Sequence, residues 1–243
     1  MARRSELARI ELPRVELQTP ALVIADLHLD LDDARSCAEF TDWLAAQRGA
    51  RALVILGDLF EYWLGAPHLE HAGGKAICAA LARFARERGP VHVLHGNRDF
   101  LLDARFEAAS GARVHPFGLR ASCAGSEYLF LHGDELCIHD HAYQRLRRVI
   151  RSRPVRALAR VLPRPALERA ARRLRRRSVA AVAAKAPLDV EQVASVGWQW
   201  LEETGARELV VGHAHRWREE RDADGRRLRV LDAWGGPRAV LAL

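Results

Sequence analysis

Short apolar runs that end in a metal-ligating type of residue recur five times along the chain. The runs are rich in β-branched residues and leucine, and Asp, Asn or His follows each of them within a few positions. They occupy residues 23–25, 53–56, 91–94, 128–131 and 209–211. A short continuous apolar run is typical of a buried strand in a parallel sheet. We therefore expect the ligating residues beyond the carboxyl ends of strands, where ligands gather in open α/β sheets.

The residues that follow these runs form one candidate ligand set. It contains two carboxylates, four imidazoles and one side-chain amide: Asp26, His28, Asp58, Asn97, His132, His213 and His215. Because no cysteine belongs to it, the set disfavours a structural zinc site and suits divalent ions such as Mn²⁺, Fe²⁺ or Zn²⁺. Seven ligands are too many for one tetrahedral ion with an open position. They suit two ions that share a carboxylate about 3.5–4 Å apart. Each residue alone could be a turn residue, but the repetition at five strand ends favours a metal site.

Length and composition predict a single enzyme domain. The 243 residues, 49% of them hydrophobic, are enough to bury a full core, and no apolar run is long enough to span a bilayer. Residues 1–19 mix Arg and Glu among apolar residues, lack the apolar region of a signal peptide, and are expected to form a frayed N-terminal extension. The cysteines form no C-x-x-C pair, as is typical of reduced thiols in a cytosolic protein.

Positive charge is concentrated in one segment. Residues 145–185 contain fourteen Arg and one Lys against a single acid, Glu168, so they carry +14, whereas the whole chain carries +7 and the remainder −7. Their apolar residues recur at spacings compatible with amphipathic helices, which three prolines divide into short pieces. We expect residues 139–186 to form a basic helical cap of two or three helices over the metal site. The core would then comprise residues 20–138 and 187–243.

The densest cluster of arginine, at residues 172–177, is typical of segments that bind phosphate-rich surfaces. A solvated helix face is the alternative interpretation, because Arg replaces Lys almost everywhere in this chain. Nucleic acid is disfavoured, since the segment has no aromatic residue to stack on bases. Basic amphipathic helices suit a membrane interface, although this segment also lacks the Trp or Phe that commonly anchors such a helix.

The motifs resemble those of the calcineurin-like metallophosphoesterase superfamily. The series Asp-x-His, Gly-Asp, Gly-Asn-x-Asp, His-Gly-Asp and Gly-His-x-His occurs here in that order. Within the superfamily, the longer stretches are similar to the UDP-2,3-diacylglucosamine diphosphatase family of lipid A biosynthesis. These stretches are residues 25–29, 57–61, 95–102, 132–134 and 212–216. The resemblance covers roughly residues 20 to 240, and Arg98 stands where many superfamily members carry His.

This resemblance implies a fold and a reaction. The fold is an α/β sandwich of two facing, mixed sheets flanked by helices, with an inserted helical cap. The reaction is hydrolysis of the pyrophosphate bond of UDP-2,3-diacylglucosamine, a UDP-linked diacylated glucosamine lipid, to UMP and 2,3-diacylglucosamine 1-phosphate. Two divalent metal ions would serve it, Mn²⁺ foremost. The resemblance also implies a monomer in the cytoplasm, peripherally associated with the anionic surface of the inner membrane.

Individual residues take roles by the same resemblance. The first ion would be held by Asp26, His28, Asp58 and His215, and the second by Asp58, Asn97, His132 and His213. The candidate catalytic residues are Asn97, the bridging Asp58, and Arg98, whose cationic fork would neutralise charge on the reacting phosphoryl group. Because a phosphate leaving group needs little acid assistance, an Arg in place of an imidazole fits a pyrophosphatase.

The substrate contacts of the family can also be carried over. The matching positions are Asn97, Arg98, Asp140, Tyr143, Ser178, Val182, Lys185 and His213. Val182 stands where a polar amide is common, and we expect it to pack on the apolar face of its helix. Asp99 and Asp134 adjoin ligands in sequence, so they are candidates to accept the second N–H of a ligating imidazole. A turn-stabilising Asx residue is an equal alternative for Asp134.

Two other functions stay open from the sequence alone. A phosphodiesterase or phosphatase acting on another nucleotide or lipid phosphate would use the same metals. A non-catalytic, metal-bearing module could be recruited by its basic cap to membrane or nucleic acid. The complete ligand set argues against the module, because a retired enzyme is expected to lose at least one ligand.

Overall fold

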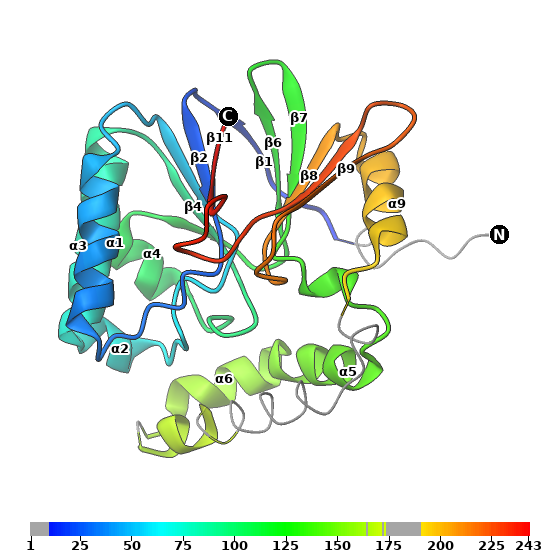
Figure 1. Cartoon of the computed structure of the whole chain (residues 1–243). Helices are drawn as coiled ribbons and strands as arrows, with labels where there is room; N and C mark the ends of the chain where they lie inside the picture. The colour runs from blue at the N-terminus through cyan, green and yellow to red at the C-terminus, as the bar shows by residue number, and fades with distance from the viewer. Residues whose placement is uncertain (1–9, 164, 172, 174–190) are drawn as a thin grey trace.

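Two β-sheets face each other in the computed structural model, which describes residues 10–163, 165–171, 173 and 191–243 (Figure 1). The five-stranded sheet has the order β11-β2-β3-β4-β5 and is parallel except at its antiparallel edge strand β11. Its strands are β2 (Ala21–Ile24), β3 (Ala52–Ile55), β4 (Val91–Leu94), β5 (Arg113–His115) and β11 (Val240–Ala242). Three of the five apolar runs singled out in the sequence thus form its central strands.

The six-stranded sheet has the order β1-β6-β7-β8-β10-β9. It is mixed, because the pairs β6–β7 and β10–β9 are antiparallel and the other three pairs are parallel. Its strands are β1 (Arg14–Leu17), β6 (Leu119–Cys123), β7 (Ser126–Phe130), β8 (Glu208–Val211), β9 (Arg218–Arg221) and β10 (Arg227–Val230). The other two apolar runs lie here, in β7 and β8.

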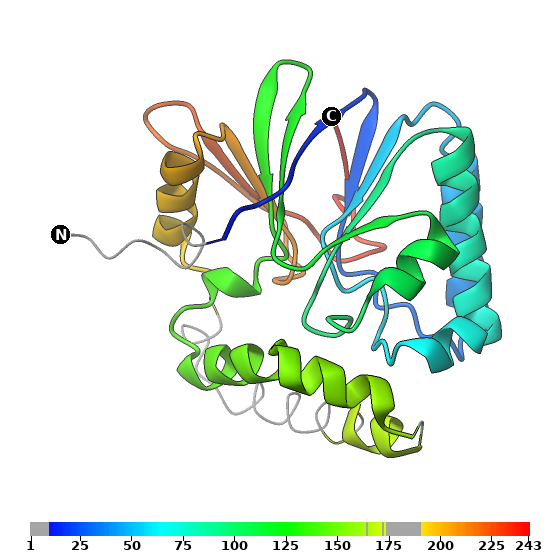
Figure 2. The ribbon, with the colours of Figure 1, turned by 180° about the vertical axis from the view of Figure 1, so that it is seen from behind.

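Helices cover the outer faces of both sheets (Figures 1 and 2). The five-stranded sheet is flanked by α1 (Ala34–Ala46), α3 (Ala72–Glu87) and α4 (Ala104–Ser110), with the short α2 (Ala66–Glu70) at one end, and α9 (Ala194–Thr204) flanks the other sheet. Successive side chains of a strand point to opposite faces of its sheet, so each strand contributes to two core clusters. Leu22 and Ile24 belong to the cluster beneath α1 and α3, whereas Val23 and Ala25 belong to the cluster between the sheets.

A separate helical layer lies beyond one end of the two sheets (Figure 1). It contains α5 (His141–Ile150), α6 (Arg153–Val161) and the helical residues 165–171, which follow β7 and the 3₁₀ turn η2 (Asp134–Leu136). Helices occur where the sequence predicted a cap, between the strands that precede His132 and His213. The rest of the predicted cap, residues 164, 172 and 174–186, lies outside the described residues.

The expectation of a frayed extension is wrong for residues 14–17. They form β1, which pairs in parallel with β6 at the edge of the six-stranded sheet. The physical reason was present in the sequence: Arg14-Val15-Glu16-Leu17 alternates polar and apolar residues, the period of a half-buried strand. Leu17 is buried in the cluster between the sheets. Among the described residues, no helix is long and apolar enough to cross a membrane.

Candidate metal centre

The structure brings the seven predicted ligands together at one end of the two sheets. Each follows a strand: Asp26 and His28 follow β2, Asp58 follows β3, Asn97 follows β4, His132 follows β7, and His213 and His215 follow β8. Five of them have left-handed backbone torsions, with φ between 49° and 71°. Asp and His adopt this conformation more readily than most residues, yet each such residue still costs of order 1–3 kcal/mol. Strain at five ligand positions is typical of a functional site.

One group of donors surrounds Asp26. Its carboxylate lies 3.6 Å from Nε2 of His215, and that nitrogen lies 3.0 Å from Nε2 of His28. The three side chains can place donor atoms within 4.8 Å of one another. Two ligands in adjacent positions around an octahedral ion, at metal–nitrogen distances of about 2.1 Å, lie about 3 Å apart. The two imidazoles therefore have the spacing of neighbouring ligands on one ion.

A second group surrounds Asn97. Its Oδ1 lies 3.0 Å from Nε2 of His132 and 3.2 Å from Nδ1 of His213. Nε2 of His132 is also 3.8 Å from Oδ2 of Asp58, and Asp26, Asp58 and His132 form a second cluster with metal-ligand spacing. The two groups adjoin through the two buried carboxylates. Asp26 stands beside Asp58 at the junction of the groups, and the predicted pair of ions stays a prediction.

Glycines allow the ligand loops to approach each other. A Cβ atom on Gly96 would lie 2.0 Å from Oδ1 of Asp58, and one on Gly212 would lie 2.5 Å from Oδ2 of Asp26. Both distances are far inside van der Waals contact, so any side chain at either position would push a ligand carboxylate aside. The glycines of the Gly-Asn and Gly-His motifs are therefore required by the geometry of the neighbouring ligand.

Hydrogen bonds to the backbone orient two of the predicted ligand side chains, His132 and Asp26. Nδ1 of His132 donates to the carbonyl of Leu56 at 2.8 Å, which leaves Nε2 to face Asp58. The backbone N–H of His213 donates to Oδ2 of Asp26 at 2.7 Å. Among the described residues, Oδ1 of Asp26 and Nδ1 of His28 have no hydrogen-bond partner although both are buried. Orphaned donors and acceptors of this kind are what a bound cation would satisfy.

The electrostatics of the site also favour a cation. Burial, with the nearby charges of Asp99 and Asp26, raises the pKa of Asp58 to about 7. Burial, with the charge of Arg98, lowers the pKa of His28 to about 3, so this imidazole is neutral and able to ligate at physiological pH. Although burial lowers the pKa of His132, Asp58 raises it to about 9, so a metal binding there must displace a proton. Donor types and environment together fit divalent metal ions.

Asp99 supports the site through the backbone rather than through an imidazole. Its fully buried carboxylate accepts the N–H groups of Gly96 at 2.8 Å, Leu59 at 2.8 Å and Asp58 at 3.3 Å. It thus ties the loop after β3 to the loop after β4. The expectation that Asp99 accepts an imidazole N–H is wrong, because the carbonyl of Leu56 takes that place for His132.

Arg98 lies beside the carboxylate of Asp58, and its predicted catalytic role stays a prediction. Its Nε is 3.7 Å from Oδ2 of Asp58, and its backbone N–H donates to Oδ1 of the same carboxylate at 2.9 Å. Sequence reasoning missed its partner, Glu61, which forms a close ion pair with the Arg98 guanidinium and lies 3.8 Å from Nδ1 of His28. Glu61 was visible at the end of the Gly-Asp-Leu-Phe-Glu stretch. Its role depends on a contact between residues 37 positions apart.

Helix α5 is joined to the site by a buried network around Asp134. Oδ2 of Asp134 accepts from Tyr143 Oη at 2.5 Å and from Arg151 Nη2 at 3.0 Å, and it lies 3.1 Å from Arg147 Nε. Although burial raises the pKa of Asp134, Arg151 and Arg147 hold it well below its ordinary value. The ring of Tyr143 stacks on His213 with centroids 6.2 Å apart. In the described part of the chain Asp134 accepts from Tyr143 and Arg151 rather than from an imidazole, and it anchors the cap.

The predicted substrate contacts fall into two groups. Asn97, Arg98, Tyr143 and His213 lie together at the metal centre, and Asp140 caps α5 by accepting the N–H of Tyr143 at 3.0 Å. Ser178, Val182 and Lys185 lie outside the described residues. The substrate roles of all these residues stay predictions.

Comparison with known proteins gives one family. The calcineurin-like phosphoesterase model matches residues 19–228. A protein of Pseudomonas fluorescens (strain SBW25) named UDP-2,3-diacylglucosamine hydrolase is 37% identical over 196 residues, which cover 80% of this chain and 78% of the relative. Proteins of the same name from Sodalis glossinidius and Pseudomonas aeruginosa (strain PAO1) are 36% identical over 216 residues and 37% identical over 223 residues. These alignments cover 88% of this chain in both cases, and 89% and 90% of the relatives. The predicted fold class and superfamily are confirmed, and the chain belongs to the calcineurin-like phosphoesterase family.

Proposed function

We propose that this protein hydrolyses the pyrophosphate bond of UDP-2,3-diacylglucosamine to give UMP and 2,3-diacylglucosamine 1-phosphate. The observation that carries the proposal is the convergence of seven metal-ligating side chains from five strand ends, with Arg98 beside them. The names of the relatives, which match this chain over most of its length, supply the substrate.

The donor set supports two divalent ions, and we propose that both are Mn²⁺. Asp26, His28, Asp58 and His215 would hold the first, and Asp58, Asn97, His132 and His213 would hold the second. When bound, such ions lower the pKa of a water so that hydroxide is available near neutral pH, and they offset charge on phosphate oxygens. Mixed carboxylate, imidazole and amide ligands without thiolate suit Mn²⁺.

The protein's own residues supply the rest of the chemistry. Arg98 keeps a permanent positive charge, and the ion pair with Glu61 fixes its guanidinium next to Asp58. In this position it would stabilise the negative charge that grows on the phosphoryl and leaving oxygens. The leaving group is itself a phosphate, so departure does not require a protonated imidazole at this position.

The cap would bind the lipid part of the substrate. Tyr143, stacked on His213, would contact the sugar phosphate together with Asn97; Asp140, Ser178, Val182 and Lys185 complete the proposed contacts. The described part of the cap exposes Leu146 and Val149 on α5 and Leu158 and Val161 on α6. Such apolar side chains beside arginines support docking on an anionic membrane surface, from which a two-chain lipid could be drawn. On this basis we propose peripheral association of a monomer with the inner membrane.

Purified protein incubated with UDP-2,3-diacylglucosamine and Mn²⁺ tests the proposal. We expect UMP and a diacylglucosamine phosphate in the mass spectrum, no reaction after chelation, and loss of both activity and metal in Asp58→Ala. Asp42→Ala, an exposed carboxylate on α1, is the control and should behave as the wild type. Near-wild-type turnover of Asp58→Ala with two ions retained would contradict the dinuclear assignment. Hydrolysis of other phosphodiesters but not of the UDP-lipid would contradict the substrate.

A further inference from the structure

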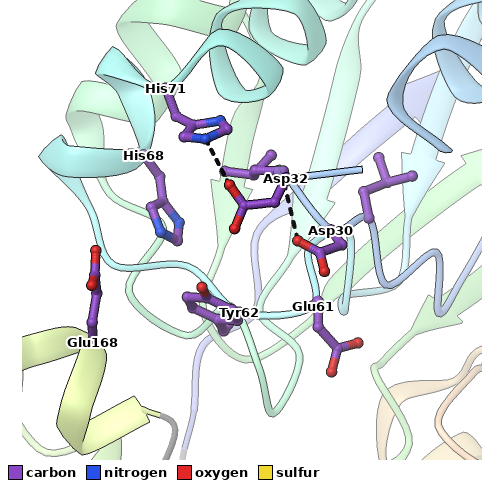
Figure 3. Close-up of a pocket in the computed structure, with 9 residues that line it drawn as sticks. Asp30, Asp32, Glu61, Tyr62, His68, His71 and Glu168 are labelled. Atoms are coloured by element: carbon purple, nitrogen blue, oxygen red, sulfur yellow. Dashed lines mark hydrogen bonds and ion pairs between the residues drawn. The ribbon is translucent and has the colours of Figure 1, made fainter. Parts of the chain in front are cut away.

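A cavity of about 160 Å³ opens beside the metal centre (Figure 3). Its polar wall contains Asp30, Asp32, Glu61, Tyr62, His68 and His71. None of these residues belongs to the ligand set, and the proposed mechanism uses only Glu61 among them. The cavity is therefore a feature that hydrolysis alone does not explain.

The cavity and the metal centre share a wall. Glu61 lines the cavity and also pairs with Arg98, and Asp30 lies two residues beyond the ligand His28. In Figure 3, Glu61 and Asp30 lie at one end of the cavity and His68 lies at the other. A ligand that fills the cavity would thus reach the phosphoryl site at the end formed by Glu61.

Carboxylates dominate the end near the metals. Oδ1 of Asp32 accepts from Nε2 of His71 at 3.0 Å, and Oδ1 of Asp30 accepts from the N–H of Asp32 at 3.1 Å. Both carboxylates are exposed, so their other oxygens are accessible to a ligand. This wall repels phosphate groups and offers little apolar surface to an acyl chain. It favours a neutral ligand rich in O–H and N–H donors.

Rings line the far end. The rings of Tyr62 and His68 lie with centroids 5.2 Å apart at an angle of 59°. His68 is buried, and its Nδ1 accepts from the N–H of Leu64 at 3.3 Å, so its proton is on Nε2. Glu168, on the helical residues 165–171 of the cap, closes this end opposite His68 (Figure 3). Aromatic faces with nearby polar groups suit a planar heterocycle.

We propose that this cavity binds the nucleoside of the substrate, with the ribose hydroxyls against Asp30 and Asp32 and the base against Tyr62 and His68. The inference rests on the proposed function and adds the residues that select the nucleotide half of the substrate. It orients the substrate, because the neutral nucleoside enters the acidic wall while its phosphates remain beside Arg98. The diacylated sugar then lies toward Tyr143 and His213, in the other half of the centre.

Three probes of increasing size test this subsite: inorganic phosphate, ribose 5-phosphate and UMP, titrated calorimetrically into the Mn²⁺-loaded protein. We expect affinity to rise at each step. Asp32→Ala should lower the affinity for ribose 5-phosphate fivefold or more, so that the gain in affinity over phosphate is lost. Tyr62→Ala should remove the gain in affinity from ribose 5-phosphate to UMP. Both should leave phosphate binding unchanged. Glu70→Ala, a carboxylate on α2 outside the cavity lining, should match the wild type for all three probes.

The outcomes separate this inference from the proposed function. Unchanged affinity steps in Asp32→Ala and Tyr62→Ala would overturn the subsite, as would a wild-type protein that binds UMP no more tightly than phosphate. In a third outcome, the wild-type protein binds UMP more tightly than phosphate, loses this preference in the two variants, and yet does not hydrolyse UDP-2,3-diacylglucosamine. That combination would overturn the proposed substrate and support the nucleoside subsite.

Discussion

Arg98 illustrates how a single residue depends on its neighbours at this site. Its charge is intrinsic, but its position depends on Glu61 and on the backbone contact with Asp58. We expect Arg98→Ala to lower kcat by about a hundredfold or more, because a preorganised cation at the reacting phosphoryl group is lost. Steady-state kinetics measure the change, and metal content and unfolding midpoint should stay at wild-type values. If only KM changed, Arg98 would instead act as a substrate clamp.

Backbone strain at the ligands gives a second prediction at this scale. His215 has φ 56°, a left-handed conformation that costs a residue with a Cβ atom roughly 1–2 kcal/mol. In the metal-free protein, His215→Gly should therefore be more stable towards urea than His215→Ala by about 1 kcal/mol. Both variants should be inactive.

Ala124 provides the matched control for this strain. It has φ 48° in the exposed turn between β6 and β7, at the opposite end of β7 from the predicted ligand His132. Ala124→Gly should raise the free energy of unfolding by about 1 kcal/mol without a change in activity. Equal stability of the Gly and Ala variants at position 215, alongside a gain at position 124, would show that His215 relaxes when its side chain is removed.

At the scale of elements, α5 is fixed to the core by buried ion pairs rather than by apolar packing alone. Arg147, buried on α5, pairs with Asp134 and, at 2.6 Å, with Glu135. We expect Arg147→Met to lower the free energy of unfolding by about 3 kcal/mol, because two carboxylates then remain buried without this partner. Arg145→Met, on the exposed face of α5, should change it by less than about 0.5 kcal/mol. Urea unfolding of both variants checks this, and equal effects would contradict the anchoring role of Arg147.

The charge of the whole molecule is asymmetric, since residues 145–185 carry +14 and the remainder carries −7. We expect the protein to bind vesicles that contain anionic lipid, because each Lys or Arg near such a surface contributes about 1 kcal/mol. Binding should weaken steeply with salt, as the Debye length shortens from about 10 Å at 0.1 M to about 3 Å at 1 M. Vesicle sedimentation across a salt series measures it.

Exposed and buried arginines of the cap should differ in their effect on vesicle binding. Arg145 and Arg148 are exposed, so replacing both by Met should weaken vesicle binding. Arg147 is buried in ion pairs, so it should contribute nothing directly to that binding. Equal sedimentation with neutral vesicles would mean that apolar contacts dock the protein. Tight binding to DNA without binding to either vesicle would return nucleic acid as the partner.

The sequence by itself determined which residues converge at the centre. A buried strand has a readable apolar run, and in a sheet the ends of such strands meet at one edge. Asp26, Asp58 and Asn97, which follow strands of one sheet, could therefore be predicted to lie together before any coordinates. His132 follows a strand of the other sheet, so its place beside them was implied by the family resemblance. The fold class and the family followed instead from the resemblance of the motifs to those of a known family.

Only the tertiary structure decided the partners of these residues. The ion pair of Arg98 with Glu61, and the burial of Arg147 and Arg151 against Asp134, join segments far apart in sequence. No local spacing encodes such contacts, because they depend on how the loops and the cap pack. The number of charges in the cap can be read from the sequence. Which of them stabilise the fold and which are exposed to a partner depends on how the cap packs.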